Sequence, residues 1–143
     1  MTKITVIDYG MGNIFNVTRA LELLKCEVCV TDDIKTILKA DKILLPGVGA
    51  FEDGIRDLRK NNLDSVLIEY AQTGKPLLGI CLGMQLLMSN SKENGDHNGL
   101  DIIKGEVIRF KDPKDYDNQY KIPHIGWNEL SMSEEKNPTT NHN

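Results

Sequence analysis

One stretch of the sequence decides the fold: Pro76-Leu77-Leu78-Gly79-Ile80-Cys81-Leu82-Gly83-Met84-Gln85. Its apolar start predicts a buried strand that ends at Cys81, and a helix-compatible run over residues 84–88 follows directly. Glycines two residues before and after a central nucleophile are typical of an elbow, a sharp strand-to-helix turn that exposes one side chain at the edge of a sheet. A Cβ at either glycine would crowd so tight a turn. The alternative is a small buried cysteine between two packing glycines.

The chemistry of this turn suits nucleophilic catalysis by Cys81. The N-terminus of the following helix favours the thiolate over the thiol. The backbone N–H of Leu82 is placed to stabilise a developing oxyanion. A second donor is expected from the Gly47-Val48-Gly49 loop, at Val48 or Gly49, because glycines allow the backbone to approach closely. An ordinary strand-ending turn is the alternative interpretation of residues 46–49.

Length and composition indicate one globular domain without a nucleic-acid or membrane partner. The chain has 143 residues, a net charge of −4 and no basic stripe, which argues against binding to a phosphate backbone. No apolar run approaches the roughly 18 residues that a membrane span needs. The first residues are too short and too polar for a secretory signal peptide, so we expect a cytoplasmic protein.

The three cysteines do not predict a disulfide framework or a metal site. Cys26 and Cys29 form a C-x-x-C pair, but the pair closes a helix and enters a strand, whereas a redox motif opens a helix. No further zinc ligands stand at a suitable spacing. We therefore expect packing roles for these two residues, and no metal.

Strands and helices alternate along the first 90 residues. Strands are expected at 3–8, 27–31, 42–45 and directly before Cys81. Helices are expected after Asn13, after Asp32 or Asp33, and over 51–73 with a break at 61–62. In the first helix, one apolar face is expected to comprise Ile14, Val17, Leu21 and Leu24. This order predicts an α/β fold with a doubly wound, mostly parallel sheet, whose chemistry gathers at the carboxyl ends of the strands.

The second part of the chain has a different character. Residues 90–98 are expected to form a polar loop, and residues 102–110 and 121–130 to form strands, so we expect a β-rich second half with antiparallel elements. Residues 131–143 have no periodicity. We therefore expect a single domain over 1–130 and a polar tail over 131–143.

Four motifs occur in order along the chain, and together they resemble the class I glutamine amidotransferases. They are residues 79–85 (Gly-Ile-Cys-Leu-Gly-Met-Gln), 8–13 (Asp-Tyr-Gly-Met-Gly-Asn), 45–51 (Leu-Pro-Gly-Val-Gly-Ala-Phe) and 123–128 (Pro-His-Ile-Gly-Trp-Asn). Within that family the set is most similar to the glutaminase subunits of imidazole glycerol phosphate synthases, from residue 2 to about residue 130.

The resemblance implies a reaction shared by two proteins. The glutaminase hydrolyses glutamine to glutamate and ammonia through a thioester on Cys81. The ammonia passes to a (β/α)₈-barrel cyclase, which forms imidazole glycerol phosphate in histidine biosynthesis. The two subunits form a heterodimer, and the glutaminase needs no cofactor.

The resemblance also assigns roles to particular residues. Gly47, Gly49 and Gln85 are expected to hold glutamine. Asn13, His124 and Trp127 are expected to face the cyclase, although Trp127 would equally suit the core. The 9–13 loop is not expected to bind a dinucleotide, because Phe15 stands where that fingerprint needs glycine.

One part of the family pattern is missing from this sequence. A proton carrier must protonate the leaving ammonia, and the family uses a histidine followed two residues later by glutamate. No His-x-Glu occurs here, and the three histidines lie elsewhere: His97 in the expected polar loop, His124 in the interface motif and His142 in the tail. We therefore expect a family fold that is incomplete at its C-terminal end, and we favour a fragment over a natural remnant as the explanation. The chain alone should have little or no glutaminase activity.

Two other functions remain open on the sequence. A paralogous amidotransferase could supply ammonia to surface-sugar biosynthesis through a similar barrel partner. A non-catalytic protein that binds and regulates a cyclase would explain the missing histidine and glutamate.

Overall fold

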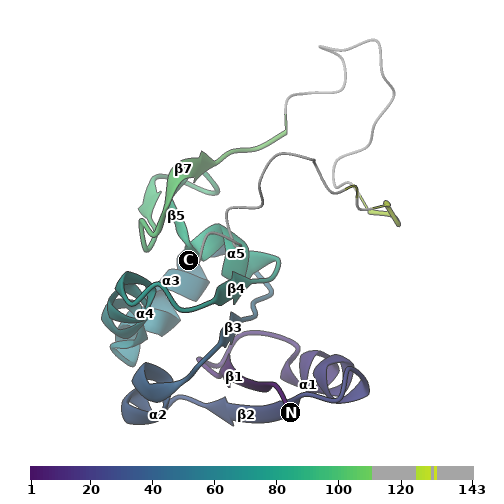
Figure 1. Cartoon of the computed structure of the whole chain (residues 1–143). Coiled ribbons are helices and arrows are strands. Elements are labelled where there is room, and N and C mark those ends of the chain that lie inside the picture. Colours follow the sequence, from purple (N-terminus) through teal and green to yellow (C-terminus); the bar gives the residue numbers. More distant parts are fainter. Residues whose placement is uncertain (111–124, 130, 132–143) are drawn as a thin grey trace. The chain divides into compact units, whose positions relative to one another are not determined.

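The computed structural model describes residues 1–110, 125–129 and 131 (Figure 1). The chain divides into two compact units, Met1–Ile108 and Arg109–Asn143. The elements of the first unit are β1 (Lys3–Ile7), α1 (Ile14–Leu23), β2 (Glu27–Thr31), α2 (Ile34–Lys39), β3 (Ile43–Leu45), α3 (Phe51–Lys60), α4 (Leu63–Gln72), β4 (Leu77–Gly79), α5 (Leu82–Leu86), β5 (Met88–Ser91), β6 (His97–Asn98) and β7 (Ile103–Val107).

The larger sheet confirms the predicted α/β topology. Its strands are parallel and lie in the order β2-β1-β3-β4. The chain goes from β1 outward to β2 and returns to β3 on the other side of β1. The strand order therefore reverses between β1 and β3, and ligands bind at such a point in doubly wound sheets, beyond the carboxyl ends of the strands.

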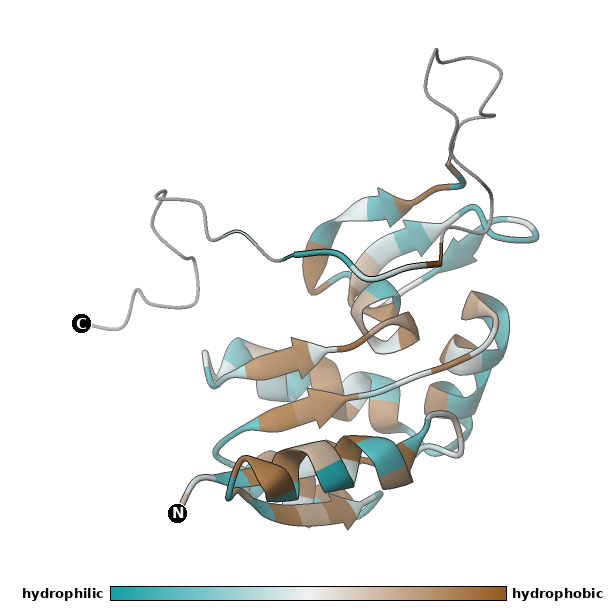
Figure 2. Cartoon of the chain, turned by 90° about the vertical axis from the view of Figure 1, so that its right-hand side faces the viewer, coloured by the Kyte–Doolittle hydropathy of each residue, from teal (hydrophilic) through white to brown (hydrophobic). Residues whose placement is uncertain are grey.

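Helices cover both faces of this sheet because its strands alternate their apolar side chains between the two faces. Val6 and Leu44 point to one face and pack with Leu21 of α1. Ile7 and Leu45 point to the other face, where they join the cluster formed with α2, α3, α4 and α5. Figure 2 shows the hydrophobic colouring concentrated along the strands of this sheet. None of the helices in the described residues is long and apolar enough to span a membrane.

The helix boundaries follow the capping residues. The Asn13 carboxamide accepts a hydrogen bond from the N–H of Asn16 at 3.2 Å and starts α1. Of the two candidate caps for α2, Asp33 is the one used. Asn62 takes a left-handed conformation (φ 57°) and separates α3 from α4, as the break signal predicts. The prediction that Leu24 belongs to the apolar face of α1 is wrong, because α1 ends at Leu23 and Leu24 is 74% exposed.

A smaller sheet follows α5, in the order β6-β5-β7. The prediction of a polar loop over 90–98 is wrong in part, because β5 and β6 pair antiparallel at Asn90–Asn98 and Ser91–His97. Asn94 and Gly95 both have positive φ between these strands, which is the conformation that Asn-Gly favours in hairpin turns. The strand predicted over 102–110 is present as β7, parallel to β5.

The second unit bears on one further prediction. A strand was expected over 121–130, but the described residues 125–129 lie in no strand. Residues 121–124 and 130 lie outside the described residues, as does the predicted tail apart from Ser131.

Candidate active site

Cys81 occupies a strained turn between β4 and α5. Its backbone angles are φ 54° and ψ −119°, a conformation that side chains other than glycine rarely adopt. The side chain is exposed, so the alternative of a buried packing cysteine is wrong. The turn has the geometry expected of an elbow that presents one side chain at the edge of a sheet.

Both glycines that flank Cys81 are required by close backbone contacts. A Cβ on Gly79 would lie 2.5 Å from the Cα of Met84 and 2.6 Å from its nitrogen. A Cβ on Gly83 would lie 1.9 Å from the carbonyl oxygen of Leu45. These neighbours are backbone atoms that cannot rotate away, so the prediction that neither position has room for a Cβ is confirmed.

The loop after β3 lies directly against the first turn of α5. A Cβ on Gly47 would lie 2.9 Å from both the Gly83 nitrogen and the Leu82 Cβ. The loop after β1 reaches the same place: Gly49, with φ +107°, lies next to the end of the Met11 side chain. The three loops that the sequence placed at the carboxyl edge of the sheet therefore meet around Cys81.

Two side chains that the sequence analysis missed hold the ends of the 47–50 loop. The Tyr9 hydroxyl donates a hydrogen bond to the Pro46 carbonyl oxygen at 2.8 Å. A carboxylate oxygen of Glu93 accepts a hydrogen bond from the N–H of Phe51, also at 2.8 Å, where α3 begins. Ala50 offers no side-chain cap to α3, so Glu93 takes that role from the distant β5–β6 hairpin.

Burial and charge keep the Tyr9 hydroxyl protonated. Desolvation raises the pKa of Tyr9 well above its ordinary value, and the negative charges of Asp57 and then of Cys81 add to the effect. The hydroxyl therefore remains a hydrogen-bond donor across the ordinary pH range.

The remaining predicted site residues are placed as follows. Val48 is about half exposed, at 51%, in the loop. Gln85 is partly buried in α5, where its N–H donates to the Cys81 carbonyl oxygen at 3.2 Å. The Asn13 side chain caps α1, and Trp127 in the second unit is exposed. His124 lies outside the described residues.

His97 differs from its prediction as a solvated loop residue. It lies on β6 with its side chain only 20% exposed, and its Nε2 is 4.0 Å from a carboxylate oxygen of Glu52. That nitrogen is buried and has no hydrogen-bond partner among the described residues. The prediction failed because residues 90–98 form a hairpin that folds His97 inward.

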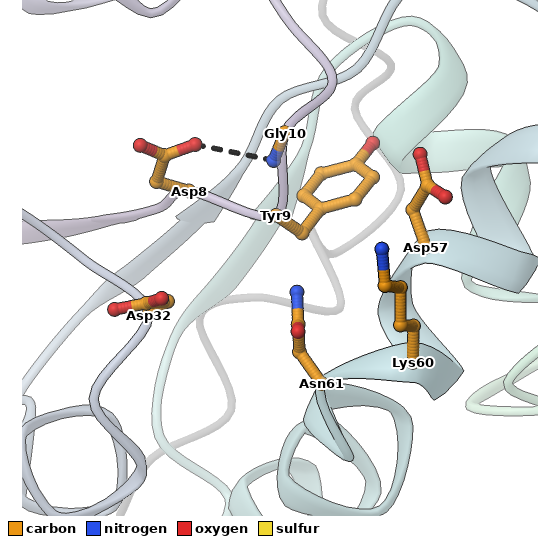
Figure 3. A pocket seen from close by; sticks show the side chains of 7 residues that line it. All are labelled: Asp8, Tyr9, Gly10, Asp32, Asp57, Lys60 and Asn61. Atoms are coloured by element: carbon orange, nitrogen blue, oxygen red, sulfur yellow. Dashed lines mark hydrogen bonds between the residues drawn. The ribbon is translucent and has the colours of Figure 1, made fainter.

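A polar pocket of about 310 Å³ lies beside Tyr9 (Figure 3). It is lined by Asp8, Tyr9, Gly10, Asp32, Asp57, Lys60 and Asn61. In Figure 3 the Tyr9 hydroxyl is directed toward the side of the pocket on which Asp57 lies. Three carboxylates against one lysine disfavour a phosphate-bearing ligand, in agreement with the absence of a dinucleotide fingerprint in the 9–13 loop.

Metal-binding groups do not gather in the part of the chain that the structure describes. No cluster of three or more histidine, cysteine, aspartate or glutamate side chains there could hold an ion. Cys26 and Cys29 are free and partly buried, and Cys26 packs against the cluster formed by Val6, Leu21 and Leu44.

The fold and the site define an α/β protein with a cysteine at a strand-to-helix elbow, beyond the carboxyl ends of a parallel sheet. The family profile described as glutamine amidotransferase class-I matches residues 5–142. The chain belongs to this class-I glutamine amidotransferase family.

Curated relatives narrow the similarity further. Similar curated proteins from three bacteria are all named imidazole glycerol phosphate synthase subunit HisH, the Legionella protein with the suffix 1. The chain is 44% identical over 135 residues to the one from Legionella pneumophila (strain Paris), covering 94% of this chain and 63% of the relative. It is 46% identical over 133 residues to that of Geobacter sulfurreducens, covering 92% and 64%. It is 50% identical over 125 residues to that of Carboxydothermus hydrogenoformans, covering 87% and 60%. The chain thus spans less than two thirds of the length of these relatives.

A solved structure supports the fold alone. The chain is similar to a peptidase E-like protein from Listeria monocytogenes EGD-e, with a TM-score of 0.58 and 18% sequence identity. The similarity covers 71% of this chain and 63% of that one. At this identity the shared feature is the α/β architecture, and no activity follows from it.

Proposed function

We propose that this chain provides the nucleophile and the oxyanion-binding loops of the glutaminase subunit of an imidazole glycerol phosphate synthase. The observation that carries the proposal is the exposed, strained turn at Cys81, with both flanking glycines closed in by backbone atoms. The names of the curated relatives support the particular enzyme. The three cysteines of this chain are free, which suits a cytoplasmic enzyme, because reducing compartments keep thiols unpaired.

The proposed reaction begins with the attack of the Cys81 thiolate on the side-chain amide carbon of glutamine. A carbon–sulfur bond forms, and the amide oxygen becomes an oxyanion. The intermediate then collapses: the carbon–nitrogen bond breaks, ammonia leaves after taking a proton, and a glutamyl thioester remains on Cys81. Water hydrolyses the thioester to glutamate and restores the thiol.

Backbone N–H groups at the turn are proposed to stabilise the oxyanion. The N–H of Leu82 is one donor, and the N–H of Val48 or Gly49 is the other. The close approach of Gly47 to Leu82 and Gly83 supports this arrangement, because it brings the loop to the first turn of α5. Gly47, Gly49 and Gln85 are proposed to hold the glutamine.

The ammonia is proposed to pass to a (β/α)₈-barrel cyclase bound as a heterodimer. Asn13, His124 and Trp127 are the residues proposed to face it. The exposed aromatic side chain of Trp127 supports an interface role, because such residues anchor many protein interfaces.

The general base is not supplied by the motifs of this sequence, which holds no His-x-Glu. We therefore propose that Cys81 of these 143 residues reacts with glutamine-like electrophiles, but that the chain turns over glutamine slowly or not at all. A cysteine without a proton donor for the leaving ammonia reacts more readily with an electrophile whose leaving group needs no proton.

A glutamine analogue with a chloromethyl ketone in place of the carboxamide tests the proposal. The thiolate adds to the ketone carbon and gives an oxyanion; the sulfur then displaces chloride from the neighbouring methylene as the carbonyl re-forms, so no general acid is required. Peptide mass spectrometry should find the adduct on Cys81, with Cys26 and Cys29 unmodified as internal controls. Excess glutamine should slow the reaction. Labelling of all three cysteines alike, or no protection by glutamine, would contradict the proposal and favour a cyclase-binding role without catalysis.

A further inference from the structure

Tyr9 has a buried hydroxyl group that packing alone does not explain. The residue follows β1 and is only 2% exposed. A phenylalanine would fill the same space, and a buried hydroxyl costs free energy unless it forms a hydrogen bond. The hydroxyl donates to the carbonyl oxygen of Pro46, which lies 37 positions away in the sequence. Tyr9 therefore holds Pro46, the first residue after β3, in place through this hydrogen bond.

This hydrogen bond fixes the direction of a peptide group at the start of the 47–50 loop. The Pro46 carbonyl belongs to the same planar group as the N–H of Gly47. Within this plane the carbonyl and the N–H of a trans peptide point in opposite directions, so the Gly47 N–H points away from the Tyr9 hydroxyl. The orientation of this first peptide group therefore sets the starting direction of the backbone in the 47–50 loop.

Gly47 is enclosed between Tyr9 and α5. A Cβ at this position would lie 2.5 Å from the Tyr9 hydroxyl oxygen and 2.9 Å from the Gly83 nitrogen. The phenol is thus one wall of a narrow space, and the turn that carries Cys81 is the other. A shift of the phenol would be transmitted directly to the loop.

The loop needs such an anchor because it contains two glycines. Glycine allows many backbone conformations, so a loop of this kind holds one conformation only where contacts impose it. Among the described residues, Glu93 secures the far end at Phe51, and Tyr9 secures the end next to Cys81.

We propose that Tyr9 is a positioning residue of the glutaminase site, an inference that rests on the proposed function. Its hydroxyl orients the Pro46–Gly47 peptide so that the N–H groups of the loop face the oxyanion formed on attack by Cys81. Tyr9 acts through the loop and has no need to touch glutamine.

The test compares two variants that each lose one hydroxyl. Tyr9→Phe removes the hydrogen bond to Pro46 and keeps the ring. Tyr70→Phe is a matched control, because Tyr70 is also buried and its hydroxyl also donates to a proline carbonyl, that of Pro76, at 3.3 Å. Pro76 precedes β4, at the end of the strand opposite to Cys81.

The readout is the ratio of two labelling rates at Cys81. The chloromethyl ketone analogue passes through an oxyanion and benefits from the loop, whereas iodoacetamide reacts by direct displacement and forms no oxyanion. Tyr9→Phe should lower the ratio by about fivefold or more, the factor that corresponds to one ordinary hydrogen bond. Tyr70→Phe should leave the ratio within about twofold of the original. An equal ratio in both variants would overturn the inference, since a general loss of stability does not separate the two reagents.

A second measurement keeps this inference separate from the proposed function. If the original chain does not react with the analogue at Cys81, the proposed function fails, and amide hydrogen exchange of residues 47–50 decides the role of Tyr9. Faster exchange in Tyr9→Phe than in Tyr70→Phe supports the anchor. Equal exchange in the two variants overturns it.

Discussion

The backbone strain at Cys81 leads to a prediction about stability. With φ at 54° and ψ at −119°, the Cβ of Cys81 is held in a region that costs about 1–3 kcal/mol for residues other than glycine. Glycine adopts positive φ without this cost, but its flexibility in the unfolded chain removes about 0.5–1 kcal/mol of the gain. Cys81→Gly should therefore be more stable than Cys81→Ala by about 1 kcal/mol.

The comparison with alanine isolates the backbone term. Cys81 is exposed, so neither substitution leaves a cavity or removes much buried apolar surface. Cys81→Ser serves as a further control, because serine keeps the Cβ and is a good N-terminal cap for a helix. If serine matches alanine and only glycine gains stability, the gain comes from relief of strain and not from capping.

Urea denaturation followed by circular dichroism measures the three variants and the original chain under one condition. We expect Cys81→Gly to have the highest midpoint and to have lost all labelling by the glutamine analogue. A glycine variant no more stable than the alanine variant would contradict this prediction, because it would mean that the turn stores no strain.

Other predictions concern the supports of the site and a helix cap. Gly83→Ala should cost about 3 kcal/mol in the free energy of unfolding, because backbone atoms block the new Cβ. Gly74→Ala has open space around the new Cβ but a φ of +72°, so it should cost only about 1–2 kcal/mol. The urea midpoints of the two variants check both values. Glu93→Ala should cost about 1–2 kcal/mol by removing the cap of α3, and Glu93→Gln should cost less, because its amide oxygen can still accept from Phe51. Hydrogen bonds from the Thr36 hydroxyl and N–H lower the pKa of Asp33. The ionised carboxylate therefore stabilises the fold at pH values above the usual aspartate pKa. This stabilisation is lost as the pH falls through the lowered pKa of the folded state. The difference in urea midpoint between the original chain and Asp33→Ala should accordingly be larger at about pH 7 than at about pH 3; a difference independent of pH would contradict it. Finally, the 143-residue chain mixed with a cyclase subunit should release little ammonia from glutamine, and turnover near that of a longer relative would contradict this expectation.

The elbow and its surroundings were predictable because the signals are local. Gly79, Cys81 and Gly83 lie within five residues, and their spacing is a steric requirement of one turn. The meeting of the three loops follows from the topology, since parallel strands end at the same edge of a sheet. The cap at Asn13 was likewise predictable, because its side chain bonds to a nearby N–H group, whereas the cap of α2 was predicted only as Asp32 or Asp33.

The supports of the site could not be found from the sequence in the same way. Tyr9 and Glu93 act on partners 37 and 42 residues away, and no spacing rule connects such pairs. Tyr9 stands inside a motif that the sequence analysis had singled out, but the motif does not reveal which atom the hydroxyl meets. The β5–β6 hairpin was missed although Asn94-Gly95 is a hairpin signal, because short polar strands lack the apolar alternation that marks a strand.

A crystal structure of the chain with the γ-aldehyde analogue of glutamine bound would show whether Cys81 and the neighbouring N–H groups form the proposed oxyanion site. The thiol adds to the aldehyde and gives a tetrahedral thiohemiacetal with the geometry of the proposed intermediate. We predict a bond from Cys81 Sγ to this carbon, with the new oxygen accepting hydrogen bonds from the N–H of Leu82 and from the N–H of Val48 or Gly49. An adduct on Cys26 or Cys29, or an oxygen on Cys81 that points to solvent without these donors, would contradict the account.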